Sequence, residues 1–283
     1  MLDTRALKEM NPLKYSITFA CYNQVNYTRQ CVDSMMKHGL DLSRLVVVDN
    51  GSSDDTREYL STLPLGGRIF NKSNLGCGVA WSQGALALQS EWTIVMNNDV
   101  LVSGGWIENL IHVAEEHGLK IISPSLIEGP LDYDFDAFAE DAMVKMKDAL
   151  RMGDRHAVCL AVHESVWRDV GYFQPIPKLL GYEDTMFFHE VDKAGIPTGM
   201  TGRSWLHHYG SITVSAMKLE RGLSEKDGLG YRRNYRLLQQ GWLERKLKKI
   251  RKLRQKRLWC AQETAQFGMS MHGGRENGRF SWQ

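Results

Sequence analysis

The sequence lacks any hydrophobic run that approaches the roughly 20 apolar residues of a membrane-spanning helix. Residues 1–16 contain no apolar core of the kind found in a secretory signal peptide. Paired cysteines are missing too, because the cysteines are odd in number and form no Cys-x-x-Cys motif: Cys21, Cys31, Cys77, Cys159 and Cys260. We therefore expect free, partly buried thiols and a cytoplasmic protein.

Two phosphate-binding signatures are absent as well. There is no Gly-x-x-x-x-Gly-Lys-Ser/Thr motif, and no Gly-x-Gly-x-x-Gly follows a predicted strand. These absences argue against a kinase-like phosphate loop and against a dinucleotide-binding dehydrogenase. The chain instead has a marked charge asymmetry: residues 1–231 carry 21 Lys and Arg against 30 Asp and Glu, whereas residues 232–283 carry 14 against 3. We expect an acidic body and a basic extension with different tasks.

Apolar runs alternate with helical patterns in the acidic body. The run at 45–48 is continuously apolar, as expected of a parallel strand that is covered on both faces. The apolar run at 92–96, the segment 15–20, which is rich in β-branched and aromatic residues, and the segment 198–207 predict further strands. This succession favours an α/β fold with a mostly parallel sheet flanked by helices. The acidic segment 128–156 is weakly periodic, and we expect an inserted loop with a helix that contributes to substrate specificity.

Polar residues follow several of the predicted strands. They are the pairs and triplets Tyr22-Asn23, Asp49-Asn50-Gly51, Asn97-Asn98-Asp99 and His207-His208. In an open parallel sheet, ligands bind outside the carboxyl ends of the strands. Carboxylates and amides at that edge suit a ribose, a base edge and a divalent cation that shares its coordination with substrate phosphates.

Six segments carry a resemblance to a known family. In order, SITFACYNQ, VVVDNGSSDDT, NLGCGVAWSQG, IVMNNDV, LLGYEDTMFF and HHYGS resemble the inverting family 2 glycosyltransferases of the GT-A fold, over about residues 15–215. The resemblance implies a Rossmann-like GT-A domain over 1–231 with an acceptor-side insertion at 128–156, followed by a basic helical extension over 232–283. It also implies transfer of a sugar, with inversion, from a UDP- or dTDP-type donor to a hydroxyl group.

The resemblance assigns residues to the donor site and to a metal. The nucleotide-sugar residues would be Ala20, Tyr22, Asn23, Asp49, Gly51, Asn74, Gly76, Asn97 and Asn98. The triplet Asn97-Asn98-Asp99 matches the Asp-x-Asp element of the family with an amide at its first position, so Asp99 would be the main protein anion on the metal. His208, in the spacing His-x-Gly-Ser, and the neighbouring His207 would be the histidine ligands. A histidine ligand favours Mn²⁺ over Mg²⁺.

The pair Glu183-Asp184 matches the acid pair that the family uses in catalysis. The resemblance implies that Asp184 is the general base and that Glu183 supports it or contacts the acceptor. Many family members carry a further acid two positions later, where this chain has Met186. Each motif taken alone also has a structural interpretation. Asp49 suits a turn after a strand, and an acid at the start of a helix interacts favourably with the helix dipole.

The segment 243–258 holds nine Lys or Arg and one Glu, with Leu243, Leu247, Ile250 and Leu258 at helical spacing. Such a helix suits an anionic membrane surface, a nucleic-acid backbone or simple packing on the acidic body. We expect the last 20 residues to be mobile or to take part in assembly.

Three functions remain open from the sequence. The first is a glycosyltransferase of polysaccharide biosynthesis, acting on a glycan or lipid-linked glycan, as a cytoplasmic protein that can bind the inner membrane face. The second is a DNA glycosyltransferase that modifies a hydroxylated base and uses the basic segment to hold DNA. The third is a non-catalytic nucleotide-sugar-binding module, against which the presence of Asp99, Asp184 and His208 argues.

Overall fold

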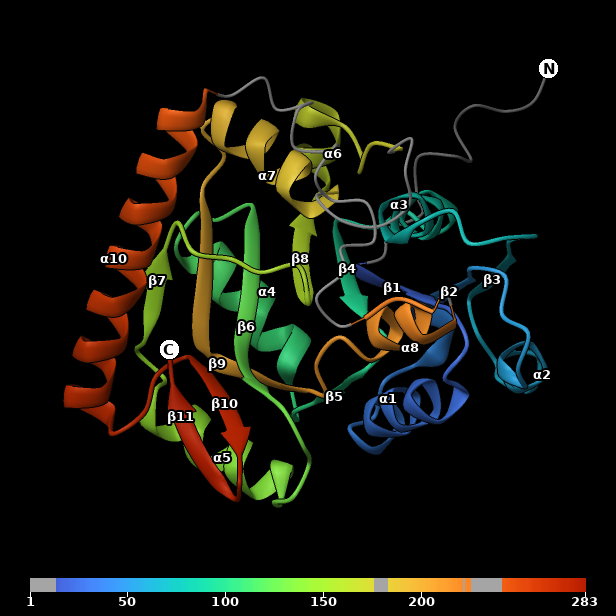
Figure 1. The fold of residues 1–283 in the computed structure, drawn as a ribbon, viewed down its shortest axis with the longest axis horizontal. Coiled ribbons are helices and arrows are strands. Elements are labelled where there is room, and N and C mark those ends of the chain that lie inside the picture. Colours follow the sequence, from blue (N-terminus) through green and yellow to red (C-terminus); the bar gives the residue numbers. More distant parts are fainter. Residues whose placement is uncertain (1–13, 176–182, 221, 225–240) are drawn as a thin grey trace.

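The computed structural model describes residues 14–175, 183–220, 222–224 and 241–283, arranged around one curled sheet with helices on both sides (Figure 1). Its main strand order is β11-β10-β6-β8-β4-β1-β2-β3, and β9 pairs with β5, β6 and β7. The parallel block of the sheet consists of β1 (Tyr15–Cys21), β2 (Leu45–Asp49), β3 (Gly67–Phe70) and β4 (Trp92–Asn97).

The parallel block confirms the predicted alternation of strands and helices. Every residue of β2 is buried, as its unbroken apolar run predicts. The helices that connect these strands are α1 (Val25–Lys37), α2 (Thr56–Thr62) and α3 (Cys77–Ala87). The register pairs Cys21 with Asp49 and Ala20 with Asn97, so the carboxyl ends of β1, β2 and β4 lie side by side.

Beyond β4 the sheet is mixed. Strand β8 (Cys159–His163) runs antiparallel to both β4 and β6 (Ile121–Glu128), whereas β9 (Thr198–His208) is parallel to β6. The short β5 (Val100–Val102) pairs with the end of β9, where Val100 lies opposite His208. Because Asp99 directly precedes β5, this pairing brings the end of β9 next to the end of β4.

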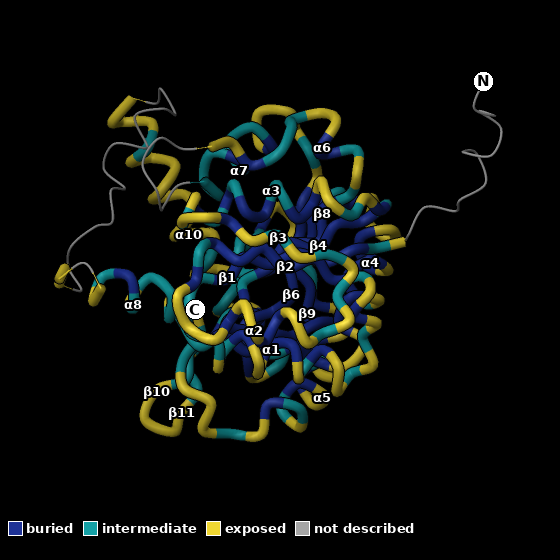
Figure 2. The backbone as a smooth tube through the Cα atoms, turned by 90° about the vertical axis from the view of Figure 1, so that its right-hand side faces the viewer, coloured by how far each residue is buried: buried dark blue, intermediate teal, exposed yellow. Residues whose placement is uncertain are grey.

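Three further helices cover the sheet. They are α4 (Trp106–Glu116), α6 (Glu164–Val170) and α7 (Glu183–Lys193). Helix α8 (Ile212–Glu220) lies instead beside the carboxyl ends of β1 and β4. Two apolar clusters lie on opposite faces of the parallel block, one under α1 and α4 and one under α3, α6 and α7. Figure 2 shows that buried backbone is concentrated in these strands and in the helix turns that face them.

The segment predicted as an insertion, 128–156, forms a helix and an edge strand. Helix α5 (Phe135–Lys145) begins at Asp134, whose carboxylate accepts a hydrogen bond of 3.1 Å from Ala137 N. Strand β7 (Leu150–Met152) then adds to β9. Together with Trp205 of β9, this segment builds a third apolar cluster, so much of the insertion belongs to the core.

The basic extension continues as helix α10 (Trp242–Phe267), which contains the predicted segment 243–258. Residues 225–240, within which the predicted domain boundary falls, lie outside the described part of the chain. After α10, strands β10 (His272–Glu276) and β11 (Arg279–Trp282) form a hairpin, and β10 pairs in parallel with β6. Of our two expectations for the C-terminus, mobility was wrong, because these residues extend the main sheet and Met271 is buried. A role in assembly stays a prediction.

All five cysteines are free, as expected, and Cys21, Cys31 and Cys159 are buried. Among the helices of the described segments, none is both long and apolar enough to cross a bilayer.

Candidate active site

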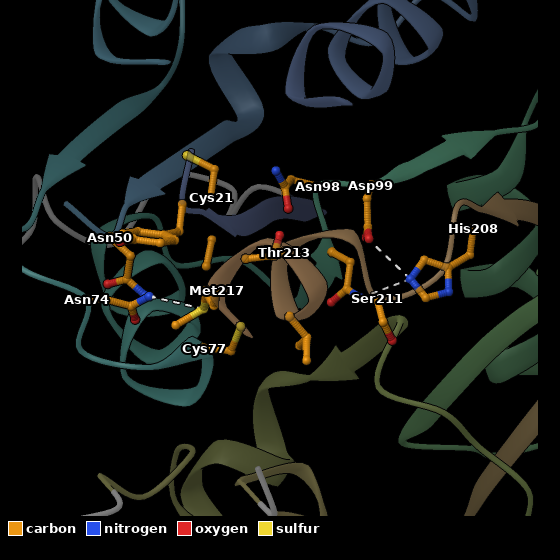
Figure 3. Close-up of a pocket in the computed structure, with 14 residues that line it drawn as sticks. Cys21, Asn50, Asn74, Cys77, Asn98, Asp99, His208, Ser211, Thr213 and Met217 are labelled. Atoms are coloured by element: carbon orange, nitrogen blue, oxygen red, sulfur yellow. Dashed lines mark hydrogen bonds and ion pairs between the residues drawn. The ribbon is translucent and has the colours of Figure 1, made fainter. Parts of the chain in front are cut away.

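The carboxyl ends of β1 and β4 and the helix α8 enclose a cavity of about 130 Å³. Seven of the predicted site residues line it: Ala20, Tyr22, Asn74, Asn97, Asn98, Asp99 and His208. Figure 3 shows their side chains together with Asn50, one of the polar residues at the strand ends, and with residues that the sequence did not single out: Cys21, Cys77, Ser211, Thr213, Val214 and Met217. The parallel register explains this gathering, since it aligns the strand ends at one edge of the sheet.

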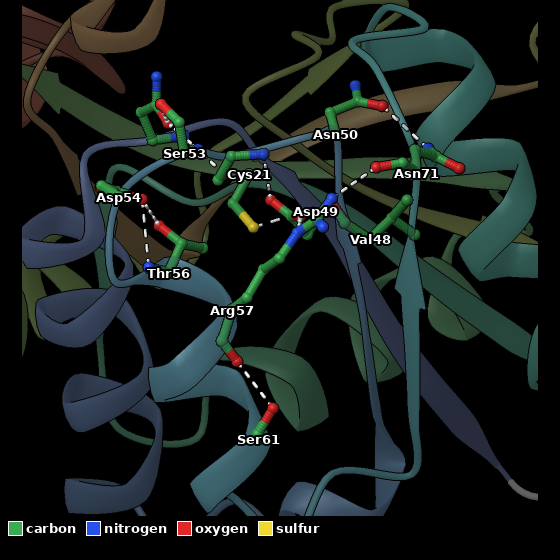
Figure 4. Close-up of polar contacts among 12 residues, drawn as sticks. Cys21, Val48, Asp49, Asn50, Ser53, Asp54, Thr56, Arg57, Ser61 and Asn71 are labelled. Carbon is green, nitrogen blue, oxygen red and sulfur yellow. Dashed lines mark hydrogen bonds and ion pairs between the residues drawn. The ribbon is translucent and has the colours of Figure 1, made fainter.

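Asp49 lies beside the cavity with its carboxylate already engaged. Its side chain is fully buried, accepts a bond of 2.6 Å from Arg57 Nε, and accepts a second of 3.0 Å from Ser52 N (Figure 4). Asn50, the next residue, does line the cavity and donates to Gly76 O over 3.1 Å. In this structure Asp49 therefore fixes the loop that presents Asn50.

Two predicted glycines are required by the backbone here. Gly51 has φ +90°, and a Cβ atom at that position would lie 2.9 Å from the Cα of Ser73. Gly76 has φ +91° and directly precedes α3. Both positions favour glycine because other residues are strained at such angles. The neighbouring Asn23 connects the β1 and β2 loops, since its N–H donates to Ser52 Oγ over 2.8 Å.

Four ionisable side chains form a continuous set of contacts at the edge of the cavity. His208 Nε2 lies 3.3 Å from Asp99 Oδ1, and His208 Nδ1 lies 3.0 Å from Glu128 Oε1. The other carboxylate oxygen of Glu128 lies 3.1 Å from His272 Nε2. Asp99 is buried, and its Oδ2 accepts a long bond of 3.4 Å from Ile212 N.

This set of contacts shifts the ionisation of its members. Burial lowers the pKa of His208, but the hydrogen bonds and charges of Asp99 and Glu128 outweigh it and raise that pKa to about 9. The hydrogen bonds from His208 and His272 hold the pKa of Glu128 well below its usual range, although burial opposes them. At neutral pH the edge of the cavity therefore holds an imidazolium between two carboxylates.

The donor set fits a divalent cation in part. Asp99 and His208 lie close enough to share one ion, and the Glu128 contact on Nδ1 would orient the ring, as carboxylates commonly do for metal-bound histidines. Within the described ranges, however, no group of three His, Cys, Asp or Glu side chains is arranged around one ion position. A cation held by these two residues would need further ligands from its substrate.

The second predicted histidine lies apart from this pair. His207 is buried on the opposite side of β9, where its Nδ1 lies 3.0 Å from the Tyr133 hydroxyl. Its ring packs edge-on against Tyr133 and Tyr209, and burial lowers its pKa to about 4. The structure therefore brings together Asp99 and His208 but not His207.

The acid pair lies at the start of α7, beside the start of α3. A Cβ atom on Gly78 would lie 2.9 Å from the Cβ of Glu183, so the missing side chain allows the two helices to approach. Between this acid pair and the cavity lies Cys77, whose pKa is raised to about 12 by burial and then by the charges of Glu183, Asp99 and Asp184. Asp184 itself lines a second cleft of about 630 Å³ between α7 and α10.

Helix α8 closes the cavity from the solvent side. Glu220 accepts hydrogen bonds of 3.1 Å from the Tyr22 hydroxyl and 2.9 Å from Asn23 Nδ2. Asn74 Nδ2 lies 3.7 Å from Met217 Sδ. Ligand pockets commonly have volumes of about 300–1,000 Å³, so the cavity under α8 is small for a nucleotide.

Sequence reasoning missed Glu128, His272 and the α8 residues. Glu128 was assigned only to the edge of an insertion, and no local spacing connects it with His208, which is 80 residues away. His272 belongs to a segment that we expected to be mobile. Only the pairing of β6 with both β9 and β10 brings the three side chains together, and that pairing leaves no short-range signal in the sequence.

Comparison with known proteins gives consistent matches. A sequence profile of glycosyl transferase family 2 matches residues 16–170, and an uncharacterized glycosyltransferase of Rickettsia typhi is 32% identical over 100 residues. The matched stretch is 35% of this chain and 31% of that protein, so the chain spans only part of this relative's length.

Two solved structures share the fold at low sequence identity. The Staphylococcus aureus TarS fragment 1–349 in complex with UDP-GlcNAc has a TM-score of 0.53 at 14% identity, covering 69% of this chain and 58% of that one. GalNAc-T7 with UDP, GalNAc and Mn²⁺ has a TM-score of 0.54 at 15% identity, covering 71% of this chain and 44% of that one. These likenesses confirm the predicted α/β architecture.

Proposed function

The chain belongs to glycosyl transferase family 2, and we propose that it transfers a sugar from a UDP- or dTDP-type donor to a hydroxyl of a glycan or lipid-linked glycan, with inversion. The main support for this proposal is the position of the acidic residues relative to Cys77. Asp99 and His208 line the cavity at the strand ends together with Cys77, and Asp184 lines the larger cleft between α7 and α10. Two substrates could thus meet between a metal-binding pair and a carboxylate.

The cavity at the strand ends is the donor site in this proposal. Ala20, Tyr22 and Asn23 would hold the base, and Asn74, Asn97 and Asn98 would contact the ribose or sugar. Asp49 and Gly51 would act by shaping the loop, and Gly76 by starting α3. The UDP-containing structural neighbours support a nucleotide sugar as ligand. Because the cavity is small, donor entry requires α8 to move outward, which breaks the contacts of Glu220 with Tyr22 and Asn23.

Asp99 and His208 would hold the divalent cation, with Mn²⁺ preferred over Mg²⁺ because of the imidazole ligand. When bound, the cation stabilises the negative charge that grows on the departing diphosphate. The neighbour solved with UDP and Mn²⁺ supports this assignment. Glu128 would keep the His208 ring in position.

Asp184 would act as the general base from the start of α7. It would accept the proton of the acceptor hydroxyl while that oxygen attacks the anomeric carbon and the bond from that carbon to the diphosphate breaks. Attack from the side opposite the leaving group inverts the anomeric carbon. Glu183 would support Asp184 or contact the acceptor.

Helix α10 supports a location at an anionic membrane surface. Leu243, Leu247, Ile250 and Leu258 are exposed, between 48% and 65%, and their spacing places them along one side of the helix. Lysines and arginines flank them, which is the pattern of a helix that lies in a bilayer interface. Sedimentation with vesicles containing anionic lipid should capture the protein, and exchange of Leu247 and Ile250 for Gln should release it. Equal sedimentation of both proteins would remove this part of the proposal.

The donor proposal is tested by calorimetry with UDP-, dTDP- and GDP-sugars, with and without Mn²⁺. We expect one nucleotide class to bind, and to bind more tightly with the metal. Metal-independent binding would remove the cation from the proposal. If none of the three classes binds, the proposed donor class is wrong.

A further inference from the structure

More cationic than anionic side chains line the cleft between α7 and α10. Its volume of about 630 Å³ is sufficient for a sugar-sized ligand with a substituent. Five cations and three carboxylates line it: Arg155, Lys248, Arg251, Lys252 and Lys256, with Asp154, Asp184 and Asp192. Asp184, the proposed base, therefore belongs to the wall of a cleft that is positive in sum.

The carboxylates do not neutralise all of these cations. Asp192 pairs with Arg155 and, over 3.1 Å, with Lys248. Asp154 pairs over 3.2 Å with Arg151, which lies outside the cleft lining. Arg251, Lys252 and Lys256 form no ion pair within the described part of the chain, although all three line the cleft.

Two further observations favour an anion at this place. In the described structure, the buried Nε of Arg155, an N–H donor, has no hydrogen-bond partner. Partial loss of hydration, followed by repulsion from Lys256, lowers the pKa of Lys252. Unpaired polar atoms in a partly dehydrated cleft raise the free energy of the empty protein, and a bound anion would relieve that penalty.

The charge of the donor does not account for this arrangement. Among the residues that the structure describes, neither lysine nor arginine lines the cavity at the strand ends, where Asp99 and His208 offer a metal position for a diphosphate. Four of the five cations of the second cleft lie along α10, at positions 248, 251, 252 and 256, and the fifth is Arg155. They therefore face the ligand that shares the cleft with Asp184.

We infer that this cleft binds a phosphate group carried by the acceptor, with Arg251, Lys252 and Lys256 as its cationic partners. This inference rests on the proposed function, because Asp184 in the same cleft marks the acceptor side. Lysine and arginine form strong, charge-assisted hydrogen bonds with phosphate oxygens. The acceptor class is then a phosphorylated sugar or polyol whose free hydroxyl lies near Asp184.

Calorimetry with n-butyl phosphate tests the inference on the full chain, with UDP and Mn²⁺ at saturation to occupy the donor site. We expect the wild-type protein to bind n-butyl phosphate and not n-butanol. The double variant K252Q/K256Q should bind it at least about tenfold more weakly. The control K249Q/R254Q removes the same charge from positions of α10 outside the cleft, and it should bind within about twofold of wild type.

Several outcomes would overturn the inference. One is an absence of phosphate binding by the wild type, and another is an equal loss in both variants, which indicates only the overall charge of α10. A third is much tighter binding of a single-stranded oligonucleotide through Lys252 and Lys256, which assigns the cleft to nucleic acid. Metal-dependent UDP binding by K252Q/K256Q, measured in parallel, separates these failures from a failure of the proposed donor site. Tighter binding of n-decyl than of n-butyl phosphate would support a lipid-linked source of the phosphate.

Discussion

At the scale of single residues, a series of polar contacts joins Asp99, His208, Glu128 and His272 across three strands and the loop before β5. The carboxylates on both sides of His208 determine its charge, as its raised pKa shows. A divalent cation held by Asp99 and His208 would bind the neutral imidazole, so its two positive charges would replace the single charge of the imidazolium. The two carboxylates thus already favour positive charge at this position.

Replacing Asp99 by Asn keeps the size of the side chain and removes the anion. We expect the affinity for the nucleotide in the presence of Mn²⁺ to fall by a factor on the order of ten or more. Affinity without metal should change little, because the amide can still accept the Ile212 bond. Calorimetry of UDP with and without Mn²⁺ measures both quantities. Unchanged metal-dependent affinity in this variant would exclude Asp99 as a metal ligand.

Replacing Asp184 by Asn removes the proposed base while the start of α7 stays in place. We expect kcat to fall by about 10² or more, with donor affinity unchanged. Glu190→Gln is the matched control, since it changes an acid of the same helix that lies outside the cleft lining. Near-normal turnover by the Asp184 variant would assign the base to another group, and Glu183→Gln would be examined next.

The residue-level site was predicted only where a motif accompanies a strand end. Asp99 and His208 were singled out because each belongs to a motif at the end of a predicted strand, and the antiparallel pairing of β5 with β9 brings these two ends together. His207 was placed with them because adjacent positions look equivalent in a sequence. In a strand, however, neighbouring side chains point to opposite faces, and only the pairing of β9 determines which histidine faces the cavity.

At the scale of elements, the packing of α3 against α7 decides where the acid pair lies. Gly78 provides the room for Glu183, and the adjacent Phe173 fills the remaining space, with its Cβ 3.3 Å from the position of a Gly78 Cβ. The sequence did not identify α7 as the partner of α3, because α7 follows α3 by about 100 residues.

Replacing Gly78 by Ala distinguishes two effects: the helix propensity of α3 and the position of the acid pair at the start of α7. Alanine favours the helix by up to about 1 kcal/mol, so α3 itself is not weakened. The added methyl group would collide with Glu183 and displace the start of α7, so we expect transfer activity to fall more than donor affinity. Gly104→Ala is the control, because its Cβ would approach His38 no closer than 3.5 Å. Steady-state kinetics and UDP calorimetry check the prediction. Equal activity in both variants would contradict it.

At the scale of the whole molecule, the acidic body and the basic extension are joined by a buried ionic network. Arg151 of β7 donates to Glu263 of α10 through Nε over 2.7 Å and through a second nitrogen over 2.8 Å. Glu263 also accepts from Met271 N over 2.9 Å. The basic composition of the extension gives no sign of this connection, because Arg151 and Glu263 are 112 residues apart in sequence.

This network makes the extension part of the folding unit. In Glu263→Gln the buried Arg151 would keep only Asp154 as a charged partner, and we expect a loss of about 3 kcal/mol in the free energy of unfolding. Asp141→Asn, which breaks an exposed pair with Lys145, should cost no more than about 0.5 kcal/mol. Urea unfolding followed by the fluorescence of the eight tryptophans measures both variants.

The same experiment distinguishes two arrangements of the molecule. If β10 and β11 are integral to the sheet, the wild type and both variants should unfold in one transition, and only the midpoint should move for Glu263→Gln. If the extension were a separable appendage, Glu263→Gln would produce an early transition in which α10 and the hairpin unfold before the body. Because His272 contacts Glu128 from β10, an early loss of the hairpin would also remove a partner from the carboxylate that holds His208. A single transition would therefore mean that the C-terminal hairpin and the proposed metal site unfold together.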